Sequence, residues 1–271
     1  MLSVSEIIDF FKLNSSHAKK ELGQNFLINH EAILKIVNAL EIKENDKVLE
    51  IGPGLGALTD ELVELSNDLT LVEYDAKFVE FLSRSYEEKK NVKIIKNNIL
   101  KYREYDANKI IGNLPYYITT DIIEHIAIDF KNIETGVFMV QKECLNRITA
   151  LKGKDYNAIN VVLKYLFDLD IITNVKRDCF FPEPNVDSVV FRIRKKENNA
   201  ISADFLYKIA RICFLNRRKT LLNNLGSYLK DKEKVREVLA ASNLKETSRA
   251  EELSIEDFVN LANQILNLET I

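Results

Sequence analysis

Residues 47–59 read KVLEIGPGLGALT, and this stretch decides the fold. Its first half, KVLEIG, is the short apolar run of a buried strand, and its second half begins a helical pattern. The glycines at positions 52, 54 and 56 lie between the two, in what we call the glycine loop. Glycines at the end of a first strand let the backbone approach a ligand closely and start a helix with free N–H groups. The stretch therefore predicts a ligand-binding strand–loop–helix unit.

The acid at the end of the next strand narrows the class of ligand. The glycine spacing is G-x-G-x-G, with Ala57 where the dinucleotide-binding fingerprint has its third glycine. Glu73 closes the strand pattern LVEYD, where a carboxylate can accept hydrogen bonds from both ribose hydroxyls of an adenosine. Dehydrogenases and S-adenosylmethionine enzymes both place an acid there. Glu73 thus predicts an adenosine cofactor without deciding which one, and a tight turn with a surface glutamate is the structural alternative.

Strand and helix patterns alternate from about residue 30 to 195. The strand patterns are KVLEIG, DLTLVEYD, VKIIKNNIL, KIIGNLPYY, TGVFMVQKE and DSVVFRIRKK. Helical patterns between them predict an α/β fold with a mostly parallel, doubly wound sheet. From Ser202 onward only helical patterns occur, which predicts a small all-helical domain after a linker near 195–202. We expect an N-terminal segment at 1–29, an α/β domain at 30–198 and a helical C-terminal domain at 199–271.

The composition is that of an ordinary soluble globular protein. Hydrophobic residues make up 46% and charged residues 29%, and no apolar run approaches the roughly 18 residues of a membrane span. The start of the chain carries Glu6 and Asp9 instead of a basic secretory signal, so we expect a cytoplasmic protein. Cys144, Cys179 and Cys213 lie far apart and lack zinc-site spacing. We expect free thiols in a reducing cytosol and no metal site.

A second unusual turn, NLPY at residues 113–116, follows the fourth strand of the set. Ligands of open α/β sheets bind at the carboxyl ends of the strands, so this turn is expected beside the glycine loop. The Asn113 amide oxygen and a backbone carbonyl beside Pro115 can accept hydrogen bonds from an exocyclic amine, and the Tyr116 ring can stack on a purine. Two acceptors on an adenine N6 would favour a more nucleophilic nitrogen. The turn predicts an adenine-N6 target site; for Tyr117 a place in the core is an equal alternative.

The residues from Glu50 to Gly56, together with the NLPY turn, resemble S-adenosylmethionine-dependent amino-methyltransferases. More narrowly, the chain resembles the KsgA (RsmA) family of ribosomal RNA adenine N6,N6-dimethyltransferases from about residue 16 to 261. The further motifs are KKELGQNFL at 19–27, FFPEPNVDSVVFRI at 180–193, FLNRRKTLLNNL at 214–225 and RAEELSIEDFVNLA at 249–262. The resemblance implies a Rossmann-like class I methyltransferase domain with S-adenosyl-L-methionine as cofactor. It also implies 16S rRNA, in the small ribosomal subunit or its precursor, as the partner.

The resemblance also implies roles at matching positions. The implied cofactor-binding residues are Asn25, Leu27, Gly52, Gly54, Glu73, Asn98 and Asn113. The implied residues around the target base are Asn113, Pro115, Tyr116, Phe180 and Phe181. The family's phenylalanine aligns best with Phe180, and Phe181 is its neighbour. Tyr116 would stack on one face of the base, and the phenylalanine would pack near the other.

Asn98 departs from the family pattern, which usually has Asp at this position. Its amide oxygen can still accept a hydrogen bond from the adenine amino group of the cofactor. The bond loses its charge assistance, so we expect an effect on cofactor affinity more than on function. A polar loop residue without a role is the alternative.

Basic residues concentrate between 192 and 220. This stretch carries nine basic and two acidic side chains, a balance of +7 against −3 for the whole chain. Such segregation suits contacts to RNA phosphates. We expect Arg217, Arg218, Lys219 and, from an earlier loop, Lys152 to bind rRNA. A solvated face, or pairing of the two arginines with helix carboxylates, is the alternative.

Other functions fit parts of the sequence. A large-subunit (23S) rRNA adenine N6-methyltransferase of the antibiotic-resistance type shares the central motifs. A non-catalytic ribosome-assembly factor or a mitochondrial transcription factor of the same fold would leave the intact set of cofactor and target motifs unexplained. A nicotinamide dehydrogenase would leave the NLPY turn and the basic stretch unexplained. The leading prediction is therefore a monomeric enzyme that sequentially dimethylates N6 of two adjacent adenines near the end of small-subunit rRNA.

Overall fold

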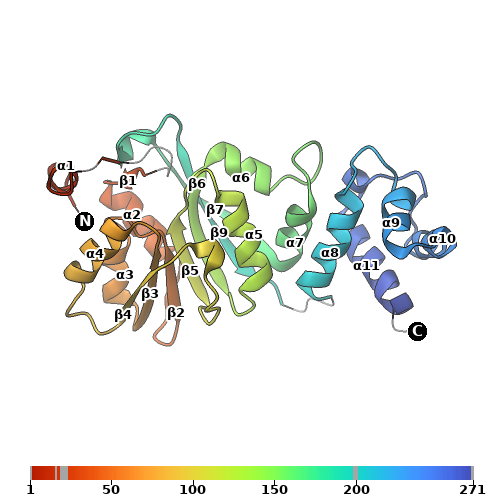
Figure 1. Cartoon of the computed structure of the whole chain (residues 1–271), viewed down its shortest axis with the longest axis horizontal. Helices are drawn as coiled ribbons and strands as arrows, with labels where there is room; N and C mark the ends of the chain where they lie inside the picture. The colour runs from red at the N-terminus through yellow and green to blue at the C-terminus, as the bar shows by residue number, and fades with distance from the viewer. Residues whose placement is uncertain (1, 16, 19–23, 198–200, 270–271) are drawn as a thin grey trace. The chain divides into compact units, whose positions relative to one another are not determined.

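The computed structural model describes residues 2–15, 17–18, 24–197 and 201–269. The predicted domain boundary at 198/199 and residues 19–23 of the KKELGQNFL motif lie outside these ranges. The chain divides into two compact units, Met1–Leu145 with Leu169–Lys195 and Asn146–Asp168 with Lys196–Ile271. We call them the sheet unit and the helical unit, and each is described by itself (Figure 1).

A seven-stranded sheet forms the core of the sheet unit, in the order β4-β3-β2-β5-β6-β9-β7. Its strands are β2 (Lys47–Ile51), β3 (Asp68–Glu73), β4 (Val92–Lys96), β5 (Lys109–Asn113), β6 (Thr135–Gln141), β7 (Phe167–Val175) and β9 (Ser188–Lys195). The first five run parallel in the order of a dinucleotide-binding sheet, whereas β9 is antiparallel to β6. The predicted doubly wound α/β class is confirmed. Strand β7 was not predicted, because most of its residues are at least partly exposed and lack a buried-strand pattern.

The sheet unit has helices before, between and after its parallel strands. They are α1 (Val4–Leu13), α2 (His30–Asn38), α3 (Thr59–Leu65), α4 (Ala76–Ser85), α5 (Thr119–Asp129) and α6 (Lys142–Ile148), with short 3-10 turns η2 (Ile99–Lys101) and η3 (Arg177–Cys179). Asn29 caps α2 as predicted, since its side chain accepts a hydrogen bond from the Ala32 N–H at 2.9 Å. Buried side chains of α2 and α3, such as Ile33 and Leu62, pack in one apolar cluster with residues of β2 and β3. This packing fixes the loops at the carboxyl ends of the strands.

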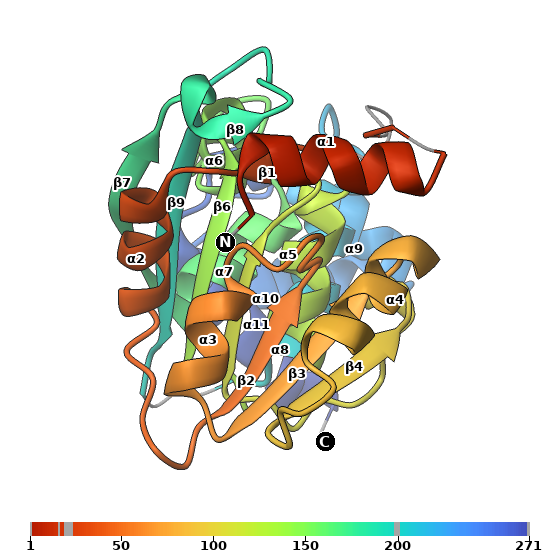
Figure 2. The ribbon, with the colours of Figure 1, turned by 90° about the vertical axis from the view of Figure 1, so that its left-hand side faces the viewer.

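A separate two-stranded ladder ties the N-terminal segment to a distant part of the chain. Strand β1 (Phe26–Leu27) pairs antiparallel with β8 (Phe180–Phe181). The N–H of Ile28 extends the ladder by donating to the Cys179 carbonyl at 2.8 Å. Figure 2 shows β1 and β8 beside α1 at the end of the sheet where β2 and β3 finish. The ladder therefore holds the segment around residue 25 next to the ends of the strands.

The helical unit contains α7 (Ala158–Leu166), α8 (Ala203–Phe214), α9 (Leu221–Leu229), α10 (Lys232–Ala241), η4 (Ala250–Glu252) and α11 (Ile255–Glu269). Residues 201–269 contain no strand, as the helical patterns predicted. Residues 146–168, which we expected in the α/β domain, pack with this unit instead. The reason is visible at Tyr156, which is fully buried and donates to the Leu253 carbonyl at 3.1 Å. None of the described helices is long and apolar enough to cross a bilayer.

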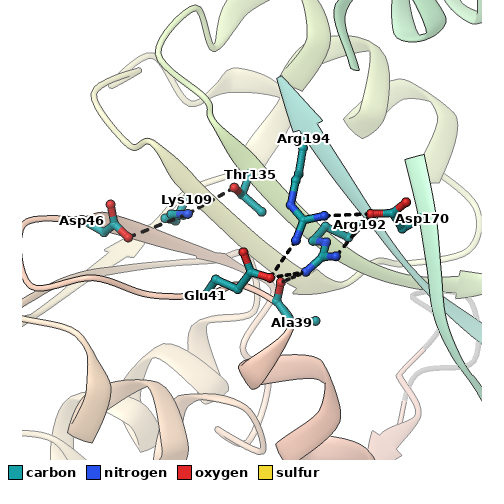
Figure 3. Close-up of polar contacts among 8 residues, drawn as sticks. All are labelled: Ala39, Glu41, Asp46, Lys109, Thr135, Asp170, Arg192 and Arg194. Atoms are coloured by element: carbon teal, nitrogen blue, oxygen red, sulfur yellow. Dashed lines mark hydrogen bonds and ion pairs between the residues drawn. The ribbon is translucent and has the colours of Figure 1, made fainter. Parts of the chain in front are cut away.

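A buried ion pair lies at the other end of the sheet, where strands β2, β5 and β6 begin (Figure 3). Lys109 is 4% exposed, and its Nζ donates to Thr135 Oγ1 at 3.1 Å. The Asp46 carboxylate lies 3.8 Å from the same Nζ. These contacts compensate a buried charge and tie the beginnings of neighbouring strands together.

Candidate active site

A cavity of about 320 Å³ opens at the carboxyl ends of the parallel strands. It brings together eight of the predicted site residues: Asn25, Leu27, Gly52, Gly54, Glu73, Asn98, Asn113 and Pro115. They come from β1, the ends of β2, β3 and β5, and the loops that follow. Tyr116, Phe180 and Phe181 do not line it. The residues predicted for the cofactor thus share one space, and their roles toward it stay predictions.

The glycine loop has the backbone geometry that only glycine adopts easily. Gly52 and Gly56 have φ angles of +64° and +82°. A Cβ at Gly52 would meet no atom within 4 Å, so this residue leaves open space where it lines the cavity. A Cβ at Gly56 would lie 2.7 Å from the Tyr86 hydroxyl. Gly52 therefore leaves room for a ligand, and Gly56 leaves room for the Tyr86 side chain.

Glu73 holds the glycine loop against the end of β3. One carboxylate oxygen accepts from the Gly54 N–H at 3.0 Å and the other from the Asp75 N–H at 2.8 Å. The side chain is nearly buried, and this desolvation raises its pKa, although the backbone hydrogen bonds oppose the shift. The backbone N–H of Tyr74 makes a third hydrogen bond to this carboxylate, which has about four lone-pair sites. The geometry thus leaves Glu73 an acceptor site for a ligand hydroxyl.

Glu50 is a second acid in the cavity, to which the sequence gave no role of its own. It is 2% exposed and accepts from the Thr59 hydroxyl at 2.7 Å. Burial raises its pKa to about 8 from the ordinary 4.5. The sequence feature that could have revealed Glu50 is an acid inside the otherwise apolar strand run VLEI. Two carboxyls line one cavity, and a cationic ligand beside them would favour their ionised forms.

Asn98 lies at the start of η2 and lines the same cavity. Its amide oxygen accepts from the Leu100 N–H at 3.0 Å, which fixes the side chain as an N-cap. An amide oxygen has two lone pairs, so one remains for a donor in the cavity. Asn98 therefore has a fixed side chain in the cavity, which the alternative of a polar loop residue without a role did not anticipate.

Asn113 ends β5 and contacts the N-terminal segment. Its Nδ2 donates to the Asn25 carbonyl at 3.2 Å. Because the amide nitrogen is engaged there, the oxygen is the atom that remains to accept from a ligand amine. The contact spans 88 positions in the chain, and no local sequence pattern could have predicted it.

The Pro115 carbonyl, which we expected to accept from a target amine, is already hydrogen-bonded within the chain. It accepts from the Thr119 hydroxyl at 2.9 Å and the Ile118 N–H at 3.2 Å, so both lone pairs are used at the start of α5. Among the described residues, none donates a hydrogen bond to the Leu114 carbonyl. Leu114, which precedes the proline, replaces Pro115 as the backbone acceptor we expect for a target amine.

The aromatic residues differ in how much of each ring is accessible. Tyr116 is half-buried, and its hydroxyl lies 3.3 Å from Ser188 Oγ, which fixes the ring. Phe180 is 3% exposed and packs in the main core cluster, whereas Phe181 is only partly buried. Phe181 is therefore better placed than Phe180 to contact a base. Tyr117, for which a core place was an equal alternative, is 55% exposed and lines the cavity, as does the exposed Tyr74.

The predicted RNA-binding residues lie in the helical unit. Arg218, Lys219 and Lys152 are exposed. Arg217 instead donates to the carbonyls of Gly153 and Tyr156, so it fastens the loop that carries Lys152. Its part in RNA binding stays a prediction, with a structural role beside it.

The basic stretch from 192 to 220 is not one continuous cationic surface. Arg192 and Arg194 lie on β9 of the sheet unit and contact Glu41 and Asp170 at distances between 2.7 and 3.2 Å (Figure 3). Carboxylates neutralise both arginines. Of Arg217 and Arg218, for which pairing with carboxylates was the alternative, Arg217 lies 3.8 Å from Glu251. The charge count along the sequence therefore overstates the cationic surface.

The three cysteines form no disulfide in the structure. Among the described residues, His, Cys, Asp and Glu side chains do not gather in groups of three or more that could hold a metal ion.

Comparisons with known proteins agree on one family. A family model described as ribosomal RNA adenine dimethylase matches residues 15–267. A ribosomal RNA small subunit methyltransferase A of Malacoplasma penetrans (strain HF-2) is 39% identical over 268 residues, covering 97% of this chain and 98% of that protein. The crystal structure of a dimethyladenosine transferase from Plasmodium falciparum has a TM-score of 0.75 at 26% identity, covering 90% of this chain and 98% of that one. The 23S rRNA methyltransferase ErmE has a TM-score of 0.67 at 23% identity, over 89% of this chain and 99% of its own, which shows a shared fold alone.

Proposed function

This chain belongs to the ribosomal RNA adenine dimethylase family, and from that premise we propose its reaction and substrate. It transfers methyl groups from S-adenosyl-L-methionine to N6 of two adjacent adenines near the 3′ end of small-subunit (16S) rRNA, giving N6,N6-dimethyladenosine. The name of the Malacoplasma relative supports the small subunit as substrate. A large-subunit target of the resistance type has only the fold likeness in its favour.

The residues around the cavity fit this cofactor. Glu73 offers an acceptor for the ribose hydroxyls, and the Asn98 oxygen offers one for the adenine amino group. Binding of the sulfonium and the ammonium beside Glu50 and Glu73 would favour the ionised carboxylates. Gly52 leaves open space for close approach of the ligand to the backbone. When bound, the cofactor supplies an electrophilic methyl group.

The target amine would be held by the NLPY turn. The Asn113 oxygen and the Leu114 carbonyl accept from its two N–H bonds, which favours a tetrahedral nitrogen whose lone pair is available for attack. Tyr116, fixed by its contact with Ser188, stacks on the base, and Phe181 packs near its other face. Positioning of the lone pair against the methyl group supplies much of the remaining rate enhancement. The amine proton leaves to solvent, so no ionised general base is required.

One observation carries the proposal: Glu73 at the end of β3 and Asn113 at the end of β5 line the same cavity. A cofactor-binding acid and an amine-accepting amide therefore lie close enough to serve one reaction. The exposed Arg218, Lys219 and Lys152 of the helical unit would contact rRNA phosphates. We place the reaction in the cytoplasm and expect a monomer.

The test is transfer of labelled methyl groups to unmethylated small ribosomal subunits and, in parallel, to large-subunit RNA, with identification of the modified nucleoside. We expect N6,N6-dimethyladenosine in small-subunit RNA alone. Label in large-subunit RNA would assign the resistance-type reaction, and no label despite bound cofactor would favour an assembly factor.

Asn113→Ala is expected to abolish transfer while the fold stays intact. The matched control is Asn67→Ala, which removes an exposed amide just before β3. Full activity of Asn113→Ala would refute the role of the NLPY turn.

A further inference from the structure

Helix α1 lines the cavity although it lies outside the part of the chain that the family model matches. The model begins at residue 15, whereas α1 spans Val4–Leu13. Ile7 of this helix and Leu2 just before it both line the cavity, together with Gly52, Glu73 and residues of the η2 loop. None of the motifs used to assign the family includes α1. The family motifs therefore do not account for the role of α1 at the cavity.

Apolar packing attaches α1 to the sheet unit. Ile7 is 2% exposed and clusters with Leu55 of the glycine loop and Phe78 of α4. Phe10 adds ring contacts to Phe78 and Phe81, with centroids 5.8 and 5.4 Å apart. This cluster connects the helix directly to the loop that leaves room for a ligand.

Polar contacts fix both ends of the helix. Ser3 and Glu6 form a capping box at its start, with the Ser3 N–H donating to Glu6 at 2.7 Å. At its end, Lys77 Nζ of α4 donates to the Asn14 carbonyl at 2.7 Å. The face that carries Ile7 is thereby held toward the cavity, while Leu13 on the same helix is 87% exposed. Figure 2 shows α1 lying across the end of the sheet where β2 and β3 finish.

We propose that α1 is part of the cofactor-binding site, with Ile7 and Leu2 forming an apolar wall that must be in place for S-adenosylmethionine to stay bound. The wall excludes water from one side of the cavity and blocks a route of release. Because the remaining lining is fixed by the sheet, undocking of α1 would open the site without unfolding it. The inference rests on the proposed assignment of this cavity to the cofactor.

The experiment measures cofactor affinity by calorimetry and release of labelled cofactor in the full chain. Ile7→Ala is expected to weaken binding about tenfold, mostly through faster release, since it removes buried apolar contacts of the wall and of the helix anchor. Leu2→Ala, which changes a less buried lining residue, is expected to weaken binding by a smaller factor and covers the case that Ile7→Ala fails to fold. Leu13→Ala, on the exposed face of the same helix, is the matched control and should bind as the wild type does.

A parallel variant, Glu73→Ala, tests the assignment of the cavity to the cofactor separately from the role of α1. If Glu73→Ala loses cofactor binding while Ile7→Ala and Leu2→Ala bind and release cofactor as the wild type does, the role of α1 is refuted and the cavity assignment survives. If Glu73→Ala also binds normally, the cofactor lies elsewhere and both assignments are refuted. Faster release in both α1 variants, with an unchanged Leu13→Ala, supports the inference.

Discussion

Gly56→Ala tests whether the glycine loop is shaped by packing as well as by ligand binding. The new Cβ would lie 2.7 Å from the Tyr86 hydroxyl, which itself donates to Asp60 at 2.7 Å. The φ angle of +82° costs an alanine about 1–2 kcal/mol. Displacing the hydroxyl from a carboxylate costs about 1.5–3 kcal/mol more. The sum is about 2.5–5 kcal/mol, which lowers the melting temperature by roughly 10 °C in a chain of this size.

A second substitution isolates the clash from the backbone strain. In a Tyr86→Phe background the offending oxygen is gone, and the nearest remaining atoms, Leu82 Cδ2 and the ring Cζ, lie at 3.5 and 3.6 Å. Gly56→Ala should then cost only the backbone strain, about 1–2 kcal/mol. Calorimetric unfolding of the four proteins gives the coupling between the two sites. An equal loss of stability in both backgrounds would refute the clash as its cause.

Gly52→Ala is the matched control within the same loop. Its φ angle is also positive, at +64°, so the backbone strain is similar, but its Cβ meets no protein atom within 4 Å. We expect a smaller loss of stability than for Gly56→Ala, together with a loss of cofactor binding. Calorimetric titration with S-adenosylmethionine measures the second effect.

Three further predictions concern charged groups. Because the pKa of Glu50 is about 8 in the folded protein and 4.5 ordinarily, the folded state keeps a proton that the unfolded state loses. Stability should therefore fall as the pH rises from about 4.5 to 8, by up to about 1.4 kcal/mol per pH unit, and Glu50→Gln should flatten this profile of melting temperature. Asp46→Ala should cost about 3 kcal/mol in urea unfolding, because it leaves Lys109 buried without its carboxylate; a neutral result would contradict the pairing. Arg218→Glu should weaken rRNA binding, measured by filter binding, and reduce its salt dependence. Arg217→Glu should mainly lower the stability of the helical unit, measured by calorimetry. Unchanged rRNA affinity of Arg218→Glu would mean that this residue belongs to a solvated face.

The local patterns predicted most of the fold because they report local physics. The buried run KVLEI, the cap at Asn29 and the alternation of strands and helices depend on neighbours in the chain. Strand β7 escaped prediction because many of its residues are exposed, so its apolar pattern is weak. The segment 146–168 was assigned to the α/β domain because it lies there in sequence, while the burial of Tyr156 places it with the helices.

The sequence by itself determined the residue types that the chemistry needs: the glycine loop, Glu73 and the NLPY turn all stand in recognisable local patterns. Only the tertiary structure decided which atoms remain available. In the folded chain the Pro115 carbonyl is hydrogen-bonded and Phe180 is buried. Arg192 and Arg194 pair with carboxylates, and α1 lies at the cavity. The physical reason is that hydrogen-bond capacity and exposure depend on partners tens to hundreds of positions away, such as Asn25 for Asn113. A pattern of neighbouring residues contains no information about those partners.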